Sequence, residues 1–206
     1  MVGARKPTAI RRTEIARAVL RIIGTQGVTA LTTSRLAAEV GVTSGALFRH
    51  FASQDDILRY ANQHAVARIE ATFPDDSLAP VRRIRTLAAN RVRVLGADPG
   101  LTWFIHSDQA ALALPADAAA LLRTVVTRTR AFLLAALREG AADGSIRRDI
   151  DPEVLLVPVL GTIHTLIGTA GGRRLTAARR RSHERVLDGL MSLLTPSPIP
   201  RRTRQS

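Results

Sequence analysis

Residues 33–51 read TSRLAAEVGVTSGALFRHF, and this stretch decides the fold. Two short helices held at a fixed angle need a small residue where they touch, a glycine in the turn and apolar residues beneath. Ala37 is the small residue, and Gly41 can adopt the left-handed turn conformation. The sequence therefore predicts a helix-turn-helix whose shared core is supplied by Leu36, Val40, Val42 and Leu47.

The outer face of the second of these two helices is expected to consist mostly of residues with short side chains. Thr32 or Thr33 is expected to cap the first helix, which ends at Gly41, and Thr43 is expected to cap the second, which ends near Phe51. Short side chains allow a helix to approach base edges in the major groove of DNA. An ordinary helical hairpin with the same spacing is the alternative. The outward residues are Thr43, Ser44, Gly45, Ala46, Arg49 and His50.

The rest of the chain also indicates helices, because no stretch alternates apolar and polar residues for long enough to suggest a sheet. An earlier helix is expected behind a cap at Thr13 and before a stop at Gly27, and Ser53 is expected to cap a later one with Asp55 and Asp56 in its first turn. Expected breaks between later helices are marked by Pro74, Pro80, Pro99 and Pro115. A long helix is expected over 117–142, before Gly144. Pro152 suits the first turn of the helix that follows. We therefore predict an all-α fold.

The formal net charge of +13 is unevenly distributed. Residues 1–54 contain eight Lys or Arg against two acidic residues, residues 55–172 are neutral overall, and residues 173–206 contain nine Arg against two acidic residues. A localised basic region favours a polyanionic partner such as nucleic acid. The alternative is a solvated basic face in an arginine-rich composition.

Residues 15–58, IARAVLRIIGTQGVTALTTSRLAAEVGVTSGALFRHFASQDDIL, resemble the N-terminal domain of the tetracycline-repressor family. The resemblance implies a three-helix DNA-binding domain, a helical second domain that forms a homodimer, and usually a small-molecule pocket in that second domain. Phe48 stands where the family commonly has a tyrosine that touches a phosphate, and Gln54 stands where a lysine is common. Basic residues of an N-terminal arm, namely Arg5, Lys6, Arg11 and Arg12, could replace these two contacts.

The expected DNA contacts follow from these positions. Thr33 and His50 are expected at phosphates, Thr43, Ser44 and Ala46 at base edges, Arg49 at guanine or phosphate, and the arm arginines in the minor groove. The partner is a double-stranded DNA operator. The complete predicted interface is Arg5, Lys6, Arg11, Arg12, Thr33, Thr43, Ser44, Gly45, Ala46, Leu47, Phe48, Arg49, His50 and Gln54.

Two further sites are predicted in the second half of the chain. A pocket for an unknown small-molecule effector is expected at His64, Trp103, Phe104 and His106, with plain core packing as the alternative for the aromatic pair. Residues 154–172 contain no Asp, Glu, Lys or Arg, which favours a buried helix in an oligomer over a membrane span. The predicted dimer interface is Leu160, Ile163, Ile167, Leu187, Leu190, Met191 and Leu194.

Other function classes find little support. The chain contains no cysteine, and the HExxH, GxSxG and Gly-rich phosphate-loop motifs are absent, so we expect no enzyme, metal or cofactor. We expect a cytoplasmic protein with a basic arm (1–12), a helix-turn-helix domain (13–54), a regulatory and dimerisation domain (55–195) and a disordered tail (196–206). The predicted function is a DNA-binding transcriptional repressor released by a ligand. The alternative is a helix-turn-helix protein without ligand regulation, such as a nucleoid-associated one.

Overall fold

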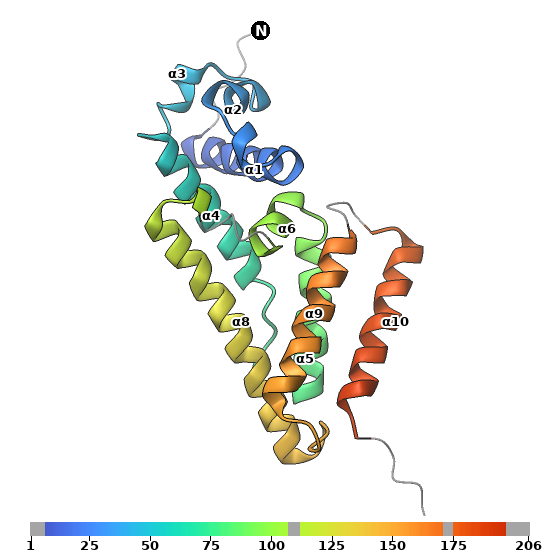
Figure 1. Cartoon of the computed structure of the whole chain (residues 1–206). Helices are drawn as coiled ribbons and strands as arrows, with labels where there is room; N and C mark the ends of the chain where they lie inside the picture. Colours follow the sequence, from blue (N-terminus) through green and yellow to red (C-terminus); the bar gives the residue numbers. More distant parts are fainter. Residues whose placement is uncertain (1–6, 107–111, 171–174, 197–206) are drawn as a thin grey trace, which may run out of the picture.

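The computed structural model describes residues 7–106, 112–170 and 175–196, and within these ranges the chain is all helical, as predicted (Figure 1). Three N-terminal helices form a small unit at one end, and the remaining helices form a longer bundle. The elements are α1 (Thr8–Gln26), the 3-10 turn η1 (Val28–Ala30), α2 (Thr33–Glu39), α3 (Ser44–Leu47), α4 (Gln54–Glu70), α5 (Pro80–Leu95), α6 (Pro99–His106), α8 (Ala116–Asp143), α9 (Pro152–Ala170) and α10 (Ala177–Leu194).

Side-chain caps begin α2, α3 and α4. The hydroxyl of Thr32 accepts a hydrogen bond from the Arg35 amide at 3.2 Å, and that of Thr43 accepts one from the Ala46 amide at 3.2 Å. Ser53 accepts one from the Asp56 amide at 3.1 Å. Such hydroxyls satisfy first-turn amides that lack the usual acceptor four residues earlier. The Ala46 amide is shared, because it also donates to the Thr43 carbonyl at 2.9 Å. The predicted caps at Thr43 and Ser53 are confirmed, and of the two predicted candidates at α2 the cap is Thr32, not Thr33.

The start of α1 differs from the prediction. The helix begins at Thr8, not behind a cap at Thr13, and the Thr13 hydroxyl donates to the Ala9 carbonyl at 3.0 Å within the helix. Arg11 and Arg12 are therefore helical residues and not part of a flexible arm. The predicted end is confirmed, because Gly27 has a φ of 84° and its amide donates to the Ile23 carbonyl at 3.0 Å.

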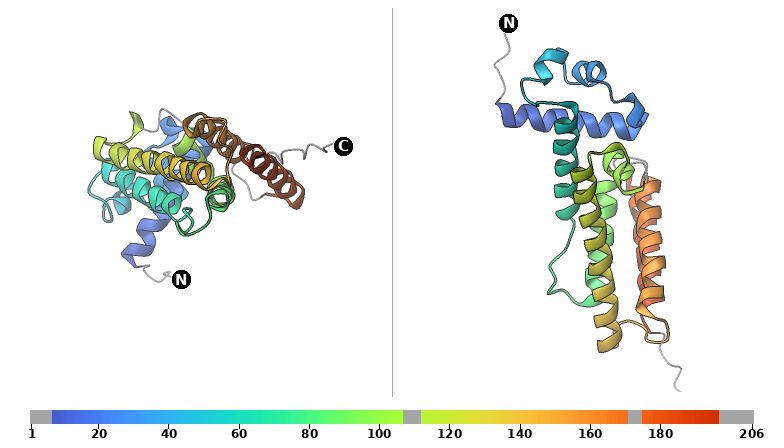
Figure 2. Two further views of the ribbon diagram at one scale, coloured as in Figure 1. Left: turned by 90° about the horizontal axis from the view of Figure 1, so that it is seen from below. Right: turned by 60° about the vertical axis from the view of Figure 1, so that its left-hand side comes forward.

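Prolines begin the later helices as predicted. Pro80 occupies the first turn of α5, Pro99 and Pro152 are the first residues of α6 and α9, and Pro115 directly precedes α8. The first turn of a helix tolerates proline because its amides have no intrahelical acceptor. In Figures 1 and 2, α4 extends from the N-terminal unit into the bundle, where it packs on α8, while α10 packs on α5 and α9 at the other side.

A buried arginine joins α5 to α8. Arg91 is 4% exposed, and its guanidinium donates to the Thr129 hydroxyl at 2.8 Å and lies 5.1 Å from the centre of the Phe73 ring. Burial lowers the pKa of Arg91 to about 10, while the negative charge of Glu70 acts in the opposite direction. The guanidinium therefore stays charged at neutral pH.

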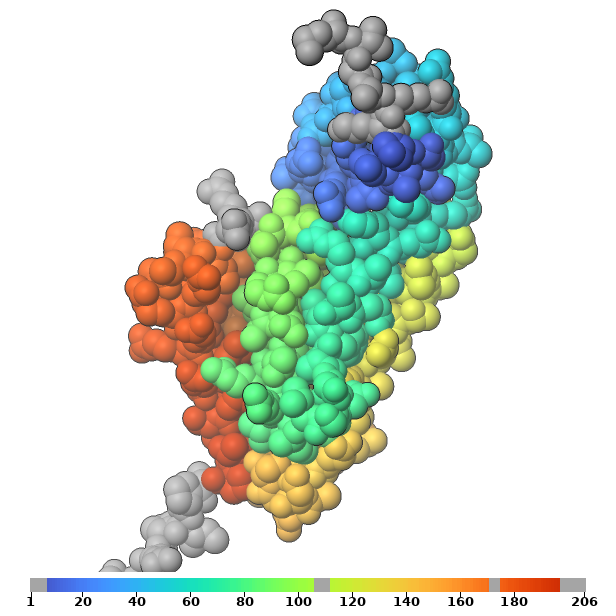
Figure 3. All heavy atoms as spheres, turned by 180° about the vertical axis from the view of Figure 1, so that it is seen from behind, coloured from blue at the N-terminus to red at the C-terminus, as the bar shows by residue number. Residues whose placement is uncertain are grey.

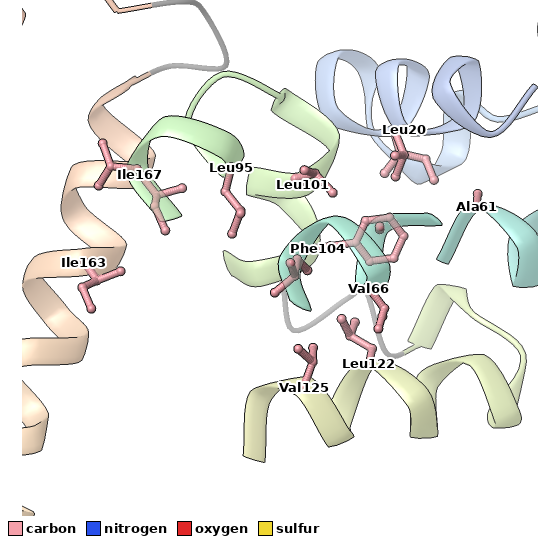
Figure 4. Packing of buried hydrophobic residues seen from close by; sticks show 14 of the residues in the cluster. Leu20, Ala61, Val66, Leu95, Leu101, Phe104, Leu122, Val125, Ile163 and Ile167 are labelled. Atoms are coloured by element: carbon pink, nitrogen blue, oxygen red, sulfur yellow. The ribbon is translucent and has the colours of Figure 1, made fainter. Parts of the chain in front are cut away.

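Two glycines allow α1 to lie directly on α6. A Cβ atom on Gly24 would lie 2.2 Å from the Pro99 carbonyl carbon, and one on Gly100 would lie 2.3 Å from the Leu20 carbonyl oxygen. Leu20 and Leu101 extend the buried core through this contact (Figure 4). The N-terminal unit is therefore joined to the bundle by close backbone packing (Figure 3).

The predicted dimer face of α9 and α10 proved wrong. Six of its seven residues are buried within the single chain, at 1% to 8% exposure, and Leu160 is partly buried against the same core. The periodicity correctly marked an apolar face, but α5 and α9 of the same chain cover the α10 part of it. The buried residues are Ile163, Ile167, Leu187, Leu190, Met191 and Leu194.

Helix α9, which carries no charged residue after Glu153, has one buried and one exposed face. With a mean hydropathy of 1.5 it is long and apolar enough to cross a membrane by length and composition alone, a test that core helices of soluble proteins also pass. Its inner face packs against α5, α8 and α10. Val154 and Val157 remain 59% and 66% exposed on the outer face.

Candidate nucleic-acid interface

The outer face of α3 and the turn that follows it project from the end of the molecule. The helix ends at Leu47 and not near Phe51 as predicted, so Arg49 and His50 lie in that turn. Thr43, Gly45 and Arg49 are exposed, Phe48 is 45% exposed, and no other group lies within 4 Å of the Cβ position of Gly45. Ser44, Ala46 and His50 are half-buried at its edges. In Figure 2, α2 and α3 lie on the side of α1 that faces away from the bundle, so a duplex can approach this face freely.

Leu47 does not belong to this face. Its side chain is 0% exposed and forms the core of the three-helix unit, so its inclusion in the DNA interface is corrected. Thr43 is exposed, but its hydroxyl is engaged as the α3 cap. Its methyl group and the O–H donor, which the cap does not use, remain available for contact with a base.

Arg11 and Arg12 do not form a minor-groove arm. Arg11 pairs with Glu14 at 2.9 Å and donates to the Val40 carbonyl at 3.4 Å. The guanidinium carbon of Arg12 lies 4.7 Å and 4.4 Å from the ring centres of Phe51 and Tyr60. Both arginines stabilise the three-helix unit through these contacts. Arg5 and Lys6 lie outside the described residues.

The remaining predicted contacts lie on α2, at the end of α3 and at the start of α4. Thr33 is half-buried at the first position of α2. Gln54 donates its side-chain amide to the Leu31 carbonyl at 3.3 Å and so ties the start of α4 to the end of η1. The Nδ1 atom of His50 is buried without a hydrogen-bond partner in the described chain, beside a cavity of about 240 Å³ that Arg12 and Tyr60 also line.

Two exposed residues of α2 were missed by the sequence reasoning. Ser34 and Arg35 lie in the first turn of α2 and are exposed. Their position directly after the Thr32 cap was the signal that could have found them, because side chains and amides at a helix start suit phosphate contacts.

The predicted effector residues do not line one pocket. Phe104 is 3% exposed and packs among Leu101, Val66 and Leu122 (Figure 4), and Trp103 meets it edge-on at 5.3 Å between ring centres. This geometry favours core packing for the pair. His64 lines a separate polar cavity with Arg17 and Arg68. The side chain of His106 lies outside the described residues. Within the described ranges, no three His, Asp or Glu side chains are grouped as metal ligands.

These features define a class, the two-domain helix-turn-helix proteins with a helical second domain. Residues 15–61 match the family described as bacterial regulatory proteins, tetR family. The N-terminal domain of the chain is therefore similar in sequence to this family, and the described chain shares the all-helical fold of a solved TetR family regulator.

Among curated relatives, the nucleoid occlusion factor SlmA of Vibrio campbellii is 32% identical over 107 residues, which cover 50% of this chain and 53% of the relative. The chain thus spans about half the length of the curated relatives it matches.

Solved structures resemble nearly the whole chain in fold. AibR, in complex with isovaleryl coenzyme A and operator DNA, has a TM-score of 0.73 at 20% identity and covers 91% of this chain and 100% of its own. PfmR of Thermus thermophilus, a TetR family transcriptional regulator, has a TM-score of 0.69 at 22% identity and covers 89% of this chain and 97% of its own.

Proposed function

We propose that this protein is a sequence-specific DNA-binding transcriptional regulator that reads duplex DNA with α3. The observation that carries the proposal is the projecting face of α3, which combines small residues with Arg49 at the end of a basic domain. A glycine without neighbours at Gly45 lets the helix backbone approach base edges closely. The proposed activity is binding in the cytoplasm, without turnover of a substrate.

Each polar residue of the face has a proposed role. Ser44, Ala46 and the methyl group of Thr43 face base edges, and Arg49 reaches guanine or a phosphate. Thr33, Arg35 and His50 hold phosphates on either side of the groove. The contacts to base edges, and not those to phosphates, distinguish sequence-specific recognition from the general attraction of DNA to a basic surface.

Footprinting on selected duplexes, followed by affinity measurements on the preferred site and on a scrambled site, tests the proposal. His50→Ala is expected to weaken both duplexes alike, whereas Ser44→Ala is expected to change the preference by about 1 to 3 kcal/mol. Arg123→Gln is the matched control for general charge, because Arg123 is exposed on α8, far from the face. Loss of equal size on every sequence for both interface variants would contradict base reading.

The regulator is proposed to act as a homodimer through the outer faces of α9 and α10. Val154, Val157 and Gly161 form an uncharged stripe on α9, and Val186 and Leu193 continue it on α10 at 45% and 67% exposure. A groove of about 800 Å³ runs between the two helices. Exposed apolar stripes of this kind are typical of self-complementary two-fold interfaces. The partner is a second copy of this chain.

Repression that a small molecule relieves is the proposed mode of control. It is supported by the fold shared with AibR, which was solved with both a coenzyme A ester and operator DNA. The single tryptophan, Trp103, lies in α6, the helix on which α1 rests, and therefore reports on this region. A compound that changes Trp103 fluorescence saturably and releases operator over the same concentrations supports this control. Fluorescence changes that never accompany release contradict it.

A second candidate function is a nucleoid-associated DNA binder without ligand control. The similarity to SlmA, named as a nucleoid occlusion factor, supports this alternative and extends over 107 residues, about half of the chain. Mapping the bound sites across a chromosome separates the two candidates. A regulator occupies few sites beside promoters, and a nucleoid-associated protein occupies many sites irrespective of promoters.

A further inference from the structure

A polar cavity of about 540 Å³ lies where the N-terminal unit meets the bundle. It is bounded by α1, by α4 and by the connection that leads into α6, and these elements adjoin one another in Figure 3. Three of its seven lining residues are arginines and a fourth is a histidine. The lining residues are Arg17, Arg21, His64, Arg68, Ala97, Asp98 and Pro99.

Among the described lining residues Asp98 is the one carboxylate, and it is already engaged. Asp98 pairs with Arg68, and one of its oxygens accepts hydrogen bonds from the amides of Gly100 at 3.0 Å and Leu101 at 3.2 Å. Arg21 pairs with Glu39, which lies on α2 outside the cavity lining. Arg17 forms no ion pair with any residue that the structure describes. The cavity therefore keeps an excess of positive charge.

His64 gives an independent indication that a partner is missing. Its Nε2 atom is buried and has no hydrogen-bond partner in the described part of the chain. The pKa of His64 is lowered by burial first, and then by the positive charges of Arg68 and Arg17, while Asp98 acts in the opposite direction. The imidazole thus lies in a positive field. A buried ring nitrogen in such a field is well placed to donate to an anion.

We propose that this cavity binds a small oxyanion, the phosphate or polyphosphate group of a soluble molecule, through Arg17, Arg68 and His64. Guanidinium and imidazole donors from α1 and α4 line this one cavity, and a multiply charged oxyanion such as phosphate can accept from several of them at once. The phosphates of a duplex bound to α3 do not reach the cavity, because it lies between α1 and the bundle, whereas α3 lies across α1 (Figure 2). The bound group joins α1 to α4 and so fixes the N-terminal unit on the bundle.

Calorimetric titration of the full chain with pyrophosphate, without DNA or divalent cations and at constant ionic strength, tests this site. Saturable binding of one pyrophosphate per chain is expected. Arg17→Gln is expected to weaken it at least tenfold, which corresponds to about 1.4 kcal/mol. Arg17 is exposed, so its replacement spares the core. Arg123→Gln removes the same charge from an exposed position on α8 and is expected to leave binding unchanged.

Imidazole NMR signals provide a second measurement that does not depend on affinity. Saturation with pyrophosphate is expected to raise the pKa of His64 and to leave that of His183, which lies between α9 and α10, unchanged. Three outcomes would overturn the proposal: no saturation at millimolar pyrophosphate, equal weakening by the Arg17 and Arg123 variants, or tighter binding of citrate than of pyrophosphate. Because no DNA is present, these outcomes leave the test of DNA reading untouched.

Discussion

Thr43 combines a structural and a recognition role at one position. Its hydroxyl accepts from the Ala46 amide at 3.2 Å, so Thr43→Ala leaves that amide without its cap. Such a loss is expected to lower the free energy of unfolding by about 1 kcal/mol. Thr43→Ser keeps the hydroxyl and is expected to retain most of that stability. Urea denaturation of the three proteins measures the difference.

Ser44→Ala is the matched comparison at the neighbouring position. Ser44 follows the cap and its side chain has no hydrogen bond within the described chain, so its replacement is expected to leave stability unchanged while altering operator preference. If Thr43→Ala proves as stable as the original chain, the capping role is wrong.

Two histidines are expected to make the fold sensitive to mild acid. Burial lowers the pKa of His64 and of His183, with Arg179 adding to the effect at His183. As pH falls below about 6.5, the unfolded chain takes up protons that the folded chain resists, so the free energy of unfolding decreases. Above that pH both states are neutral at these rings, and the contribution is constant.

Urea denaturation at pH 7.5 and at pH 5.5 measures how the free energy of unfolding depends on pH, since an unperturbed histidine titrates at about pH 6.5. The double replacement His64→Gln and His183→Gln is expected to reduce the loss of stability on acidification. Asp75, Asp117, Asp143 and Asp149 do not interfere, because the pKa of each is held below its ordinary value of 3.8. An equally steep loss in the double variant would show that other groups are responsible.

At the level of elements, the contact between α1 and α6 depends on two glycines, Gly24 and Gly100, which have no side chain to keep the helices apart. Gly24→Ala would place a Cβ atom 2.2 Å from the Pro99 carbonyl carbon, and backbone cannot yield as a flexible side chain does. Overpacking of this kind is expected to lower the free energy of unfolding by about 1 to 3 kcal/mol. Thermal and urea denaturation both measure it.

Gly45→Ala is the control for the glycine replacement. Gly45 is also helical, but nothing lies within 4 Å of its Cβ position, so alanine is expected to leave stability unchanged or to raise it by about 0.5 kcal/mol. A loss of stability in Gly45→Ala as large as that in Gly24→Ala would show that the close crossing of α1 and α6 is not the cause.

The elements that sequence predicted well are those that local chemistry determines. The caps at Thr32, Thr43 and Ser53 and the ends at Gly27 and Gly144 depend on neighbours within a few residues. The start of α1 was missed because Thr13 has the chemistry of a cap but lies within an uninterrupted helix.

Contacts between residues that are far apart in the sequence could not be predicted from the spacing of residue types. The position of Arg12 over Phe51 and Tyr60 requires the packing of α1 against α4, which no local spacing reveals. Likewise, the spacing of Leu187 and Leu190 marks an apolar face without saying whether the same chain or a second chain covers it. The candidate DNA face was largely predictable, because α3 is short and its register follows from Thr43 and Gly41.

At the scale of the whole molecule, the proposed dimer can be tested on its exposed stripe. Val157 is 66% exposed on α9, and Val157→Arg would place charge in the centre of a two-fold interface, next to its own copy. The variant is expected to shift sedimentation from dimer to monomer while keeping the helical content and the thermal stability of an intact bundle.

Val126→Arg is the matched control, since Val126 is 52% exposed on α8, away from the stripe. It is expected to remain dimeric. Leu190→Arg, in contrast, is expected to unfold the bundle, because Leu190 is 5% exposed inside the chain. A dimeric Val157→Arg protein would place the interface elsewhere.

The length of α4 has a mechanical consequence for a two-fold assembly. With 17 residues, this helix connects the reading unit to the bundle and would serve as a lever arm in the proposed dimer. At 1.5 Å per residue the arm is about 25 Å long, so a tilt of about 5° displaces its far end by about 2 Å and changes the spacing of two readers by about 4 Å. Consecutive major grooves on one face of a duplex repeat at about 34 Å. A few degrees at the base of α4 therefore suffice to take two α3 helices out of step with the DNA.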